Sequence, residues 1–525
     1  MSSLLGHRRA PLVGDLVLAL VLCVLLVMVV RPSFHAPGSG FDEGFTLAYP
    51  ARVLEGDVPH RDFSSFYGPG NPWLIAGAFA LGGRSQDTER IVGILYRLLL
   101  VLAAAGLARV VAGGGAALAA GGLVIAAIVP LGVAAYAATG ALATALAALA
   151  ALAAGRIRPS GRAWLVAAGV LAGLALLLRP DFFVALVVPA ALLVAGRGGR
   201  RRVAAFAAGL APALLALLVH AAIVGPDRLS RIASDMRASG AGRKRPFDPG
   251  SAEHLVAEPS RLLVLSIVLA LAGIGAALAM RRRDSSAGGW RAVAALALLV
   301  LGLLPYALSR LDYVHVAGPL ICALALVPLL LCAVPAAART RQIAALAAGA
   351  AVLLLAVKLA HTTLEVPLRT QASIVLGRTP QAPWELVRNG SRSFSVPAGS
   401  ALAVQQIVDG AERERRAGAR TLIVAPADLR RAFANDTYLY FMLPDLQPGT
   451  FYMEFNPRTV NRAGSGIVDE LRRADLLILN SAYDDSGEDN ASQVNGPDAP
   501  NDVVRRQFCE RVVAGSMRLL RRCRA

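Results

Sequence analysis

The sequence predicts a polytopic α-helical membrane protein with a small α/β domain at its C-terminal end. Of the 525 residues, 56% are hydrophobic and only 17% are charged, which is too apolar for an ordinary soluble domain of this length. Runs rich in Ala, Leu, Val and Gly recur along the chain, several of them about 17 to 22 residues long, which is enough for a helix to cross about 30 Å of hydrocarbon. After residue 358 these runs stop and the composition becomes that of a globular domain.

About eleven apolar runs are predicted to cross the membrane. They lie near residues 12–30, 91–111, 115–132, 135–154, 163–178, 182–196, 203–224, 261–280, 291–308, 314–334 and 342–358. The first run follows His7-Arg8-Arg9 and has no clear cleavage site of small residues. We therefore expect a retained signal-anchor helix.

The short apolar run at 72–81 decides the topology, because about ten residues cannot span a membrane as a helix. If this run does not cross and the N-terminus is cytoplasmic, four arginine-rich segments all fall on the cytoplasmic side, as the positive-inside rule requires. These segments are 155–162, 196–202, 281–291 and 338–341. The sequence thus predicts a multi-pass protein of the plasma (inner) membrane, with a membrane domain at 1–358. Its first outer loop (31–89) and the domain at 359–525 would both be extracytoplasmic.

The formal net charge of +18 does not indicate a nucleic-acid-binding protein. The arginines are gathered in short clusters between apolar runs, which is typical of cytoplasmic loops. The five cysteines form no Cys-x-x-Cys pair and no cluster with histidine, so no zinc or redox site is expected. We expect no cofactor and no obligatory metal.

The C-terminal segment alternates predicted strands and helices, which favours a small α/β domain. Strands are expected at 421–425, 450–455 and 475–480, and helices at 400–416 and 465–474. The polar segment 484–502 is expected to be a loop. A disulfide between Cys509 and Cys523 would suit an oxidising outer compartment, but the sequence leaves that pairing open.

Several polar side chains gather on the predicted outer side. They are Asp42, Glu43, Arg61, Asp62, Arg90, Arg179, Asp181, Arg310, Asp312 and His315, together with basic residues of the loop 225–258. Solvated helix ends and local ion pairs are the structural alternative for such residues. A carboxylate at the membrane surface can also act as a general base, and cations nearby can stabilise a departing phosphate. Together these groups indicate glycosyl transfer from a lipid-phosphate sugar by a single inverting displacement.

The stretch 41–90 resembles the first outer loop of the GT-C integral-membrane glycosyltransferases, in particular bacterial relatives of the protein O-mannosyltransferase and aminoarabinose-transferase group (family 39-like). The matching motifs are the Asp-Glu pair, "GDVPHRDF" at 56–63, the Tyr-Gly-Pro-Gly turn at 67–70 and the segment 79–90. "SRLDYVHV" at 309–316 is similar to a late turn of that group, and the tail is similar to its outer domain. Gly70-Asn71-Pro72 stands where the protein mannosyltransferases carry His-Pro-Pro, so protein O-mannosylation is not indicated.

The resemblance implies roles for individual residues. Asp42 is implied as the catalytic base, and Glu43 as a residue that supports the acceptor or orders the loop. The implied substrate- and phosphate-binding residues are Arg61, Asp62, Tyr67, Arg90, Arg179, Asp181, Arg310, Asp312 and His315. The implied partners are a polyprenyl-phosphate-linked sugar donor, membrane lipid and an extracytoplasmic acceptor (glycan, lipid or protein).

Two other classes of protein stay open. A transporter or flippase of a lipid-linked or anionic substrate would also have many helices and charges at one surface, although transporters concentrate ionisable groups near the bilayer midplane. A non-catalytic membrane scaffold is the other alternative. The identity of the sugar, the acceptor and the linkage is not encoded in any motif that we recognise.

Overall fold

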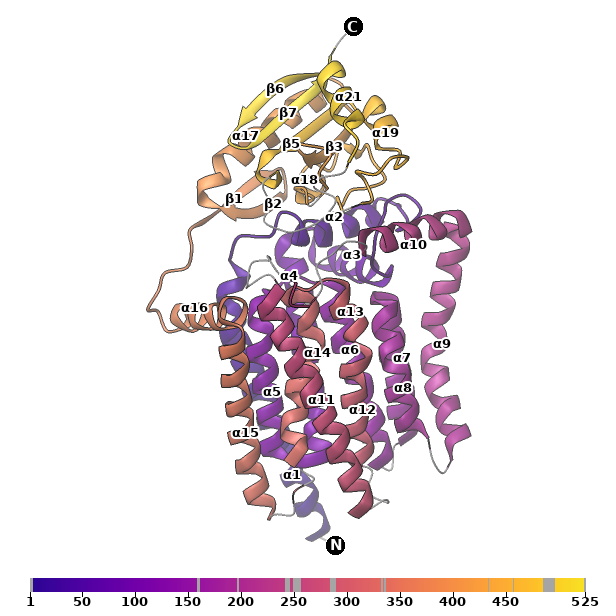
Figure 1. Ribbon diagram of the computed structural model, residues 1–525, viewed down its shortest axis with the longest axis vertical. Coiled ribbons are helices and arrows are strands. Elements are labelled where there is room, and N and C mark those ends of the chain that lie inside the picture. Colours follow the sequence, from indigo (N-terminus) through magenta and orange to yellow (C-terminus); the bar gives the residue numbers. More distant parts are fainter. Residues whose placement is uncertain are drawn as a thin grey trace.

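The computed structural model describes residues 3–157, 161–195, 198–240, 246–248, 256–283, 289–331, 334, 337–432, 434–456, 458–484 and 496–523. Long helices form a bundle, and a strand-containing domain sits on one end of it (Figure 1). The N-terminus lies at the opposite end of the bundle, and the C-terminus lies at the tip of the strand-containing domain.

Ten helices of the described chain are long and apolar enough to cross a membrane. They are α1 (Ser3–Phe34), α4 (Gln86–Ala112), α5 (Gly114–Ile128) with the 3-10 turn η1 (Val129–Leu131), α6 (Ala137–Ile157), α7 (Gly161–Leu178), α9 (Gly199–Val224), α11 (Glu258–Arg283), α12 (Gly289–Gly302) with α13 (Leu304–Ser309), α14 (Tyr313–Leu330) and α15 (Ala338–Leu359). A further apolar helix, α8 (Pro180–Val194), is shorter. Each coincides with one predicted span, and the predicted fold class is confirmed.

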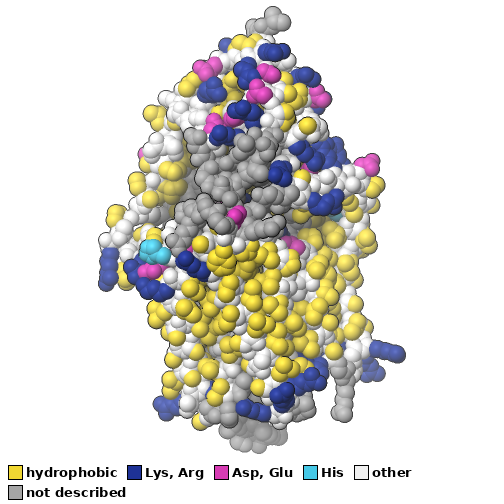
Figure 2. Space-filling model, viewed as in Figure 1, with side chains coloured by type: hydrophobic (Ala, Val, Ile, Leu, Met, Phe, Trp, Pro, Cys, Tyr) yellow, Lys and Arg dark blue, Asp and Glu magenta, His cyan; other side chains and the backbone are white. Residues whose placement is uncertain are grey.

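Three shorter helices lie at the end of the bundle that carries the strand-containing domain (Figure 1): α2 (Asp42–Leu54), α3 (Gly70–Gly82) and α10 (Pro226–Gly240). The 13 residues of α3 extend only about 20 Å, so the run at 72–81 does not span, as predicted. The C-terminal ends of α6 and α11 and the N-terminal ends of α9 and α15, which carry the described arginines of these segments, lie at the other end, with the N-terminus. Figure 2 shows hydrophobic side chains over the side of the bundle and Lys and Arg side chains at its lower end.

The C-terminal domain begins after two short segments at the edge of the bundle, η4 (His361–Glu365) and α16 (Val366–Val375). Strands β1 (Trp384–Asn389) and β2 (Arg392–Pro397) form an antiparallel hairpin. A second, mixed sheet has the order β4-β3-β5-β7-β6, in which β3 is parallel to β4 and β5, and β7 is antiparallel to β5 and β6. Its strands are β3 (Thr421–Pro426), β4 (Gln447–Pro448), β5 (Leu476–Asn480), β6 (Phe508–Ala514) and β7 (Met517–Arg522).

The helices of this domain are α17 (Ala398–Arg416), α18 (Tyr438–Met442), α19 (Ile467–Arg473) and α21 (Ala499–Gln507), with a 3-10 turn η5 (Ser481–Tyr483). The strands expected at 421–425 and 475–480 and the helix expected at 400–416 are confirmed. The end of the segment 484–502 belongs to α21, and its residues 485–495 lie outside the described chain.

The prediction of a strand at 450–455 is wrong, because these residues form a buried, irregular segment. Their backbone groups bond to side chains and to the first loop instead of to a neighbouring strand. The Phe451 N–H donates to Glu470 (3.1 Å), and the Phe451 carbonyl accepts from the Ser64 N–H (2.7 Å). The aromatic composition favours a strand locally, but these tertiary contacts override it.

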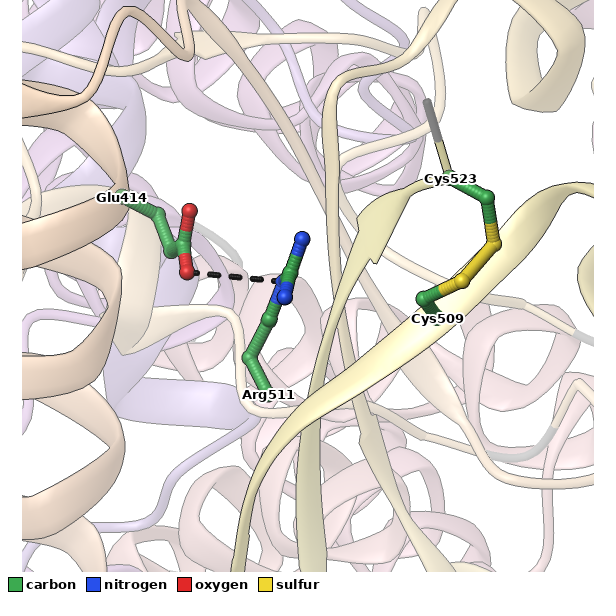
Figure 3. The surroundings of a disulfide bond; sticks show 4 residues. All are labelled: Glu414, Cys509, Arg511 and Cys523. Atoms are coloured by element: carbon green, nitrogen blue, oxygen red, sulfur yellow. Dashed lines mark ion pairs between the residues drawn. A yellow bond between two sulfur atoms is a disulfide. The ribbon is translucent and has the colours of Figure 1, made fainter. Parts of the chain in front are cut away.

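Cys509 of β6 forms a disulfide with Cys523, which directly follows β7, and this settles the pairing that the sequence left open. Figure 3 shows this bond near Arg511, whose guanidinium lies 3.6 Å from Glu414 of α17. Because the bond closes a loop of 14 residues at the edge of the sheet, it contributes on the order of 3 kcal/mol to the stability of the domain.

The C-terminal domain is fastened to the first loop by backbone contacts. The Gly38 N–H donates to the Ser395 carbonyl (2.8 Å), and the Tyr438 N–H donates to the Gly40 carbonyl (3.2 Å). Helix α2 then passes so close to α18 that a Cβ on Gly44 would lie 2.4 Å from the Tyr438 nitrogen. Only glycine fits at this position, so the sequence of α2 is adapted to the docked domain.

Substitution of Gly44 by Ala should therefore loosen the domain. We expect Gly44→Ala to lower the stability of the docked state by about 1 to 3 kcal/mol, because the added methyl group overlaps backbone atoms. The measurements are thermal unfolding in detergent and limited proteolysis of the connection 376–383. The matched control is Gly77→Ala in α3, where a Cβ meets nothing within 4 Å. Equal behaviour of the two variants would contradict the close contact.

Candidate active site

Asp42 stands at the first position of α2 and points into a cavity at the end of the bundle. The Asp42 N–H donates to the Ser39 hydroxyl (3.0 Å), which holds the start of the helix, and the helix N-terminus favours a negative charge there. Phe45 and Tyr49 lie on the same face of α2, three and seven residues further on. Their rings stack on the rings of Tyr67 (5.2 Å) and Phe63 (4.7 Å), respectively, which fixes this face against the rest of the first loop.

The cavity has a volume of about 890 Å³, which is within the usual range for small-molecule sites. It lies where α2, the 65–69 turn and the outer ends of α8, α9, α13 and α14 meet the C-terminal domain. Most of the predicted site residues line it: Asp42, Tyr67, Arg179, Asp181, Arg310, Asp312 and His315. Four separate parts of the sequence therefore contribute to one site.

Arg179 is held in place by a carboxylate and by aromatic rings. It donates two hydrogen bonds to Asp181 (3.1 and 3.0 Å), and its guanidinium lies over the rings of Tyr306 (4.6 Å) and Tyr67 (5.4 Å). A planar guanidinium fixed in this way is suited to bind a phosphate group.

The second arginine of the cavity, Arg310, forms an ion pair with Asp312 (2.7 Å). Asp312 also caps α14 by accepting from the His315 N–H (2.9 Å), and it accepts from His315 Nδ1 (2.8 Å). Burial raises the pKa of Asp312, but the charges of His315 and Arg310 and the hydrogen bonds from His315 outweigh burial and hold this pKa well below its usual range. Asp312 is therefore a permanent anion that orients both partners.

The environment of Asp42 is different. Its carboxylate is accessible from the cavity, but protein surrounds it on its other sides. Burial raises the pKa of Asp42 above its usual value, and the neighbouring Arg310 opposes this rise. A carboxylate with a raised pKa that is still accessible is suited to accept a proton from a bound hydroxyl group.

Glu43 and Arg90 do not reach the cavity. They form a buried ion pair with two contacts (2.6 and 2.9 Å), in which both side chains are at most 5% exposed. Gln86 donates to Glu43 (3.0 Å) and accepts from the N–H of Ser395 in β2 (2.9 Å). The structure therefore places these two residues where they join α2, α4 and the C-terminal domain, and not where a substrate would lie.

Arg61 and Asp62 pair with each other (2.7 Å) at the rim of a second, highly charged cavity of about 620 Å³. Arg228, Arg231 and Arg473 also line this cavity. Arg231 of the predicted basic loop donates to the Tyr452 hydroxyl (3.0 Å) and to the Ser465 carbonyl (2.6 Å), so it helps to dock the C-terminal domain. The basic residues 243–245 and His254 lie outside the described residues.

Three further residues line the first cavity and were not among the predicted site residues: His60, which lies within the motif at 56–63, and His220 and Glu454. His60 Nδ1 lies 2.9 Å from His220 Nε2, which joins the first loop to α9. Glu454 comes from the segment 450–456, accepts from the Tyr49 hydroxyl (3.0 Å) and accepts from the Asn456 amide (2.8 Å). Burial raises the pKa of Glu454 to about 7, against the opposing effect of these hydrogen bonds.

Arg97 has a structural role deep in α4. It is fully buried and donates to the carbonyl groups of Gly93, Leu131, Val133 and Ala134. It thereby fixes the turn between α5 and α6, which continues into Tyr136 at the cavity wall. Within the described ranges, no group of three or more His, Cys, Asp and Glu side chains is placed to hold a metal ion.

Comparisons with known proteins agree with this fold. Residues 67–224 match the family model described as dolichyl-phosphate-mannose-protein mannosyltransferase. The structure is similar to that of ArnT from Cupriavidus metallidurans bound to undecaprenyl phosphate, with 15% identity, 98% of each chain covered and a TM-score of 0.51. No curated protein matches the sequence.

Two further solved structures are less similar. The archaeal oligosaccharyltransferase AglB from Archaeoglobus fulgidus, in complex with an inhibitory peptide and a dolichol-phosphate, has 10% identity, coverage of 94% of this chain and 72% of that chain, and a TM-score of 0.49. The arabinofuranosyltransferase AftD from Mycobacteria has 16% identity, coverage of 97% and 40%, and a TM-score of 0.46.

The protein is thus a polytopic membrane protein with the fold of the GT-C glycosyltransferases, and the resemblance seen in its sequence is confirmed. The family match begins at Tyr67 and includes Arg90, Arg179 and Asp181, whereas Asp42 precedes it.

The buried ion pair can be tested against an exposed one. We expect Glu43→Gln to destabilise the protein by about 3 to 5 kcal/mol, because it leaves the charge of Arg90 buried and unpaired. Arg61→Gln breaks an exposed pair of the same first loop, which costs about 0 to 1 kcal/mol. Thermal unfolding in detergent measures the stability of both variants. If the Glu43→Gln variant is as stable as the Arg61→Gln variant, the buried ion pair does not hold α2, α4 and the C-terminal domain together.

Proposed function

We propose that the protein is a glycosyltransferase that moves one monosaccharide from a polyprenyl-phosphate donor to an extracytoplasmic acceptor by inverting displacement. The observation that carries this proposal is one cavity at the end of the bundle that contains an accessible carboxylate, Asp42, and two fixed guanidinium groups, Arg179 and Arg310. Residues 1–358 would form the catalytic membrane domain, and residues 359–525 the outer domain that covers it.

The proposed reaction needs one base and one stabilised leaving group. Asp42 accepts the proton of an acceptor hydroxyl group, and the acceptor oxygen forms a bond to the anomeric carbon of the sugar. The bond from that carbon to the phosphate oxygen breaks, and its electron pair leaves with polyprenyl phosphate. Arg179 and Arg310 would balance the negative charge of this phosphate, and His315 lies beside them on the Tyr306 ring (4.8 Å).

The surroundings of the cavity support a lipid-linked donor. A small apolar cavity of about 200 Å³ lies between α8 and α9, further from the outer end of the bundle, and Phe183 and Phe206 are among its walls. An isoprenoid chain could lie along these helices while its phosphate stays near Arg179 at the start of α8. The similar ArnT structure contains undecaprenyl phosphate, a lipid of this class.

Replacement of the base is the first test. We expect Asp42→Asn to lower sugar transfer by about 10² to 10⁴-fold, because general-base catalysis contributes about this much. Binding of undecaprenyl phosphate should be unchanged. The assay offers radiolabelled undecaprenyl-phosphate sugars and an envelope acceptor extract to the purified protein.

The control is Asp409→Asn on the exposed face of α17, which should be as active as the wild type. Equal activity of Asp42→Asn and wild type would remove Asp42 from the mechanism. If the wild-type protein binds undecaprenyl phosphate but transfers no sugar, the transporter or scaffold alternatives replace the proposed function.

The raised pKa of Asp42 predicts the pH dependence. The base must be deprotonated, so kcat/KM should fall as the pH decreases through the pKa of Asp42, with a midpoint above the usual value of about 3.9. Arg310→Gln removes a charge that lowers this pKa and should move the acidic limb to higher pH. A pH profile of both proteins measures this. An acidic limb that stays in place in the variant would contradict the coupling.

A further inference from the structure

The C-terminal domain contributes one segment, 450–456, to the wall of the catalytic cavity. Phe451 and Met453 of this segment line the second, charged cavity, whereas Glu454 and Asn456 line the cavity that contains Asp42. The start of the segment therefore faces the charged cavity, and its end faces the cavity that contains Asp42.

This segment is held on both sides. On the membrane side, its Phe451 carbonyl accepts from Ser64 of the first loop. On the other side, Thr450 and Phe451 donate to Glu470 of α19 (2.7 and 3.1 Å), and the Asn435 amide donates to the Met453 carbonyl (2.9 Å). Such contacts place Glu454 with the precision that a substrate-binding residue needs.

The carboxylate of Glu454 is only partly used by the protein. Its side chain is buried, and its two oxygens accept one hydrogen bond each, from Tyr49 and from Asn456. Each carboxylate oxygen has two lone pairs, so each can accept a second bond. Both donors are neutral. Among the described residues Glu454 forms no ion pair, although the charge of Arg310 acts on it.

The position of Glu454 relative to Asp42 follows from α2. Tyr49, which holds Glu454, lies on the same face of α2 as Asp42, and both carboxylates line the same cavity. A buried carboxylate without an ion-pair partner is costly for the fold, and the two hydrogen bonds and the charge of Arg310 offset only part of this cost. The Glu454 carboxylate repels phosphate when it is ionised, and its oxygens suit a hydroxyl group, which donates a hydrogen bond.

We propose that Glu454 contacts the substrate by accepting a hydrogen bond from a sugar hydroxyl group, so that the C-terminal domain completes the site that Asp42 begins. The hydroxyl belongs either to the sugar of the donor or to the acceptor. This inference rests on the proposed function and deepens it, because it gives the outer domain a direct part in substrate recognition.

The test uses Glu454→Gln in the full chain, a change that keeps the size of the side chain and a bond to Tyr49. Binding of two kinds of ligand is measured: undecaprenyl phosphate itself, and undecaprenyl-phosphate monosaccharides carrying glucose, mannose, galactose or arabinose. If the donor sugar supplies the hydroxyl, Glu454→Gln weakens binding of the sugar-bearing lipid by about tenfold or more and leaves undecaprenyl phosphate unaffected.

If the acceptor supplies the hydroxyl, binding of both lipids is unchanged and the KM for the acceptor in the transfer assay rises by a similar factor. The matched control is Glu385→Gln, the same change on an exposed residue of β1 in the same domain, which should alter neither quantity. Tyr49→Phe removes the anchor of Glu454 but keeps its charge, and should have a smaller effect than Glu454→Gln.

Two results would overturn the inference. One is no change in donor binding or in the acceptor KM. The other is an equal change in Glu385→Gln, which would indicate a general effect on the domain and not a contact with the substrate. The proposed function fails separately. If the wild type transfers no sugar while Glu454→Gln selectively weakens the sugar-bearing lipid, transfer is wrong and the role of Glu454 stands. If the wild type transfers sugar and Glu454→Gln matches it in every measurement, the proposed function stands and the role of Glu454 is wrong. With no transfer and no selective weakening, both are wrong.

Discussion

The buried ion pair between Glu43 and Arg90 is the contact on which the arrangement of the site depends. Successive residues of a helix point about 100° apart, so fixing Glu43 against α4 turns the preceding carboxylate, Asp42, towards the cavity. Gln86 extends the same contact to Ser395 of the C-terminal domain. Of the two adjacent acids, Glu43 thus holds the helix in place and Asp42 faces the cavity.

The two arginines of the cavity are likewise held in position by ion pairs. Arg179 and Arg310 each pair with an acid two residues further along the chain, at the start of a helix. These local pairs hold the guanidinium groups in position and balance the charge of each arginine. An incoming phosphate would share the arginines with Asp181 and Asp312, so little rearrangement is needed when charge develops on the leaving group.

Local patterns in the sequence were sufficient for part of this structure. The lengths of the apolar runs predicted the long helices, the short run at 72–81 was correctly predicted not to span, and the charges at the helix ends pointed to Asp42, Arg179 and Arg310. The remaining features depend on contacts between distant residues. Nothing near Glu43 indicates that Arg90 is its partner, and Glu454 lies in an aromatic segment with the local composition of a strand. Only the docked domain makes that segment irregular and turns Glu454 inwards.

The docking of the C-terminal domain has a consequence for biogenesis. The backbone contacts at Gly38 and Gly40 join residues made early in translation to Ser395 and Tyr438, which are made after the last membrane helix. The cavity is therefore enclosed only when the whole bundle has been made and the C-terminal domain has folded against it. A nascent or truncated polypeptide that lacks this domain carries Asp42 but cannot complete the wall of the cavity.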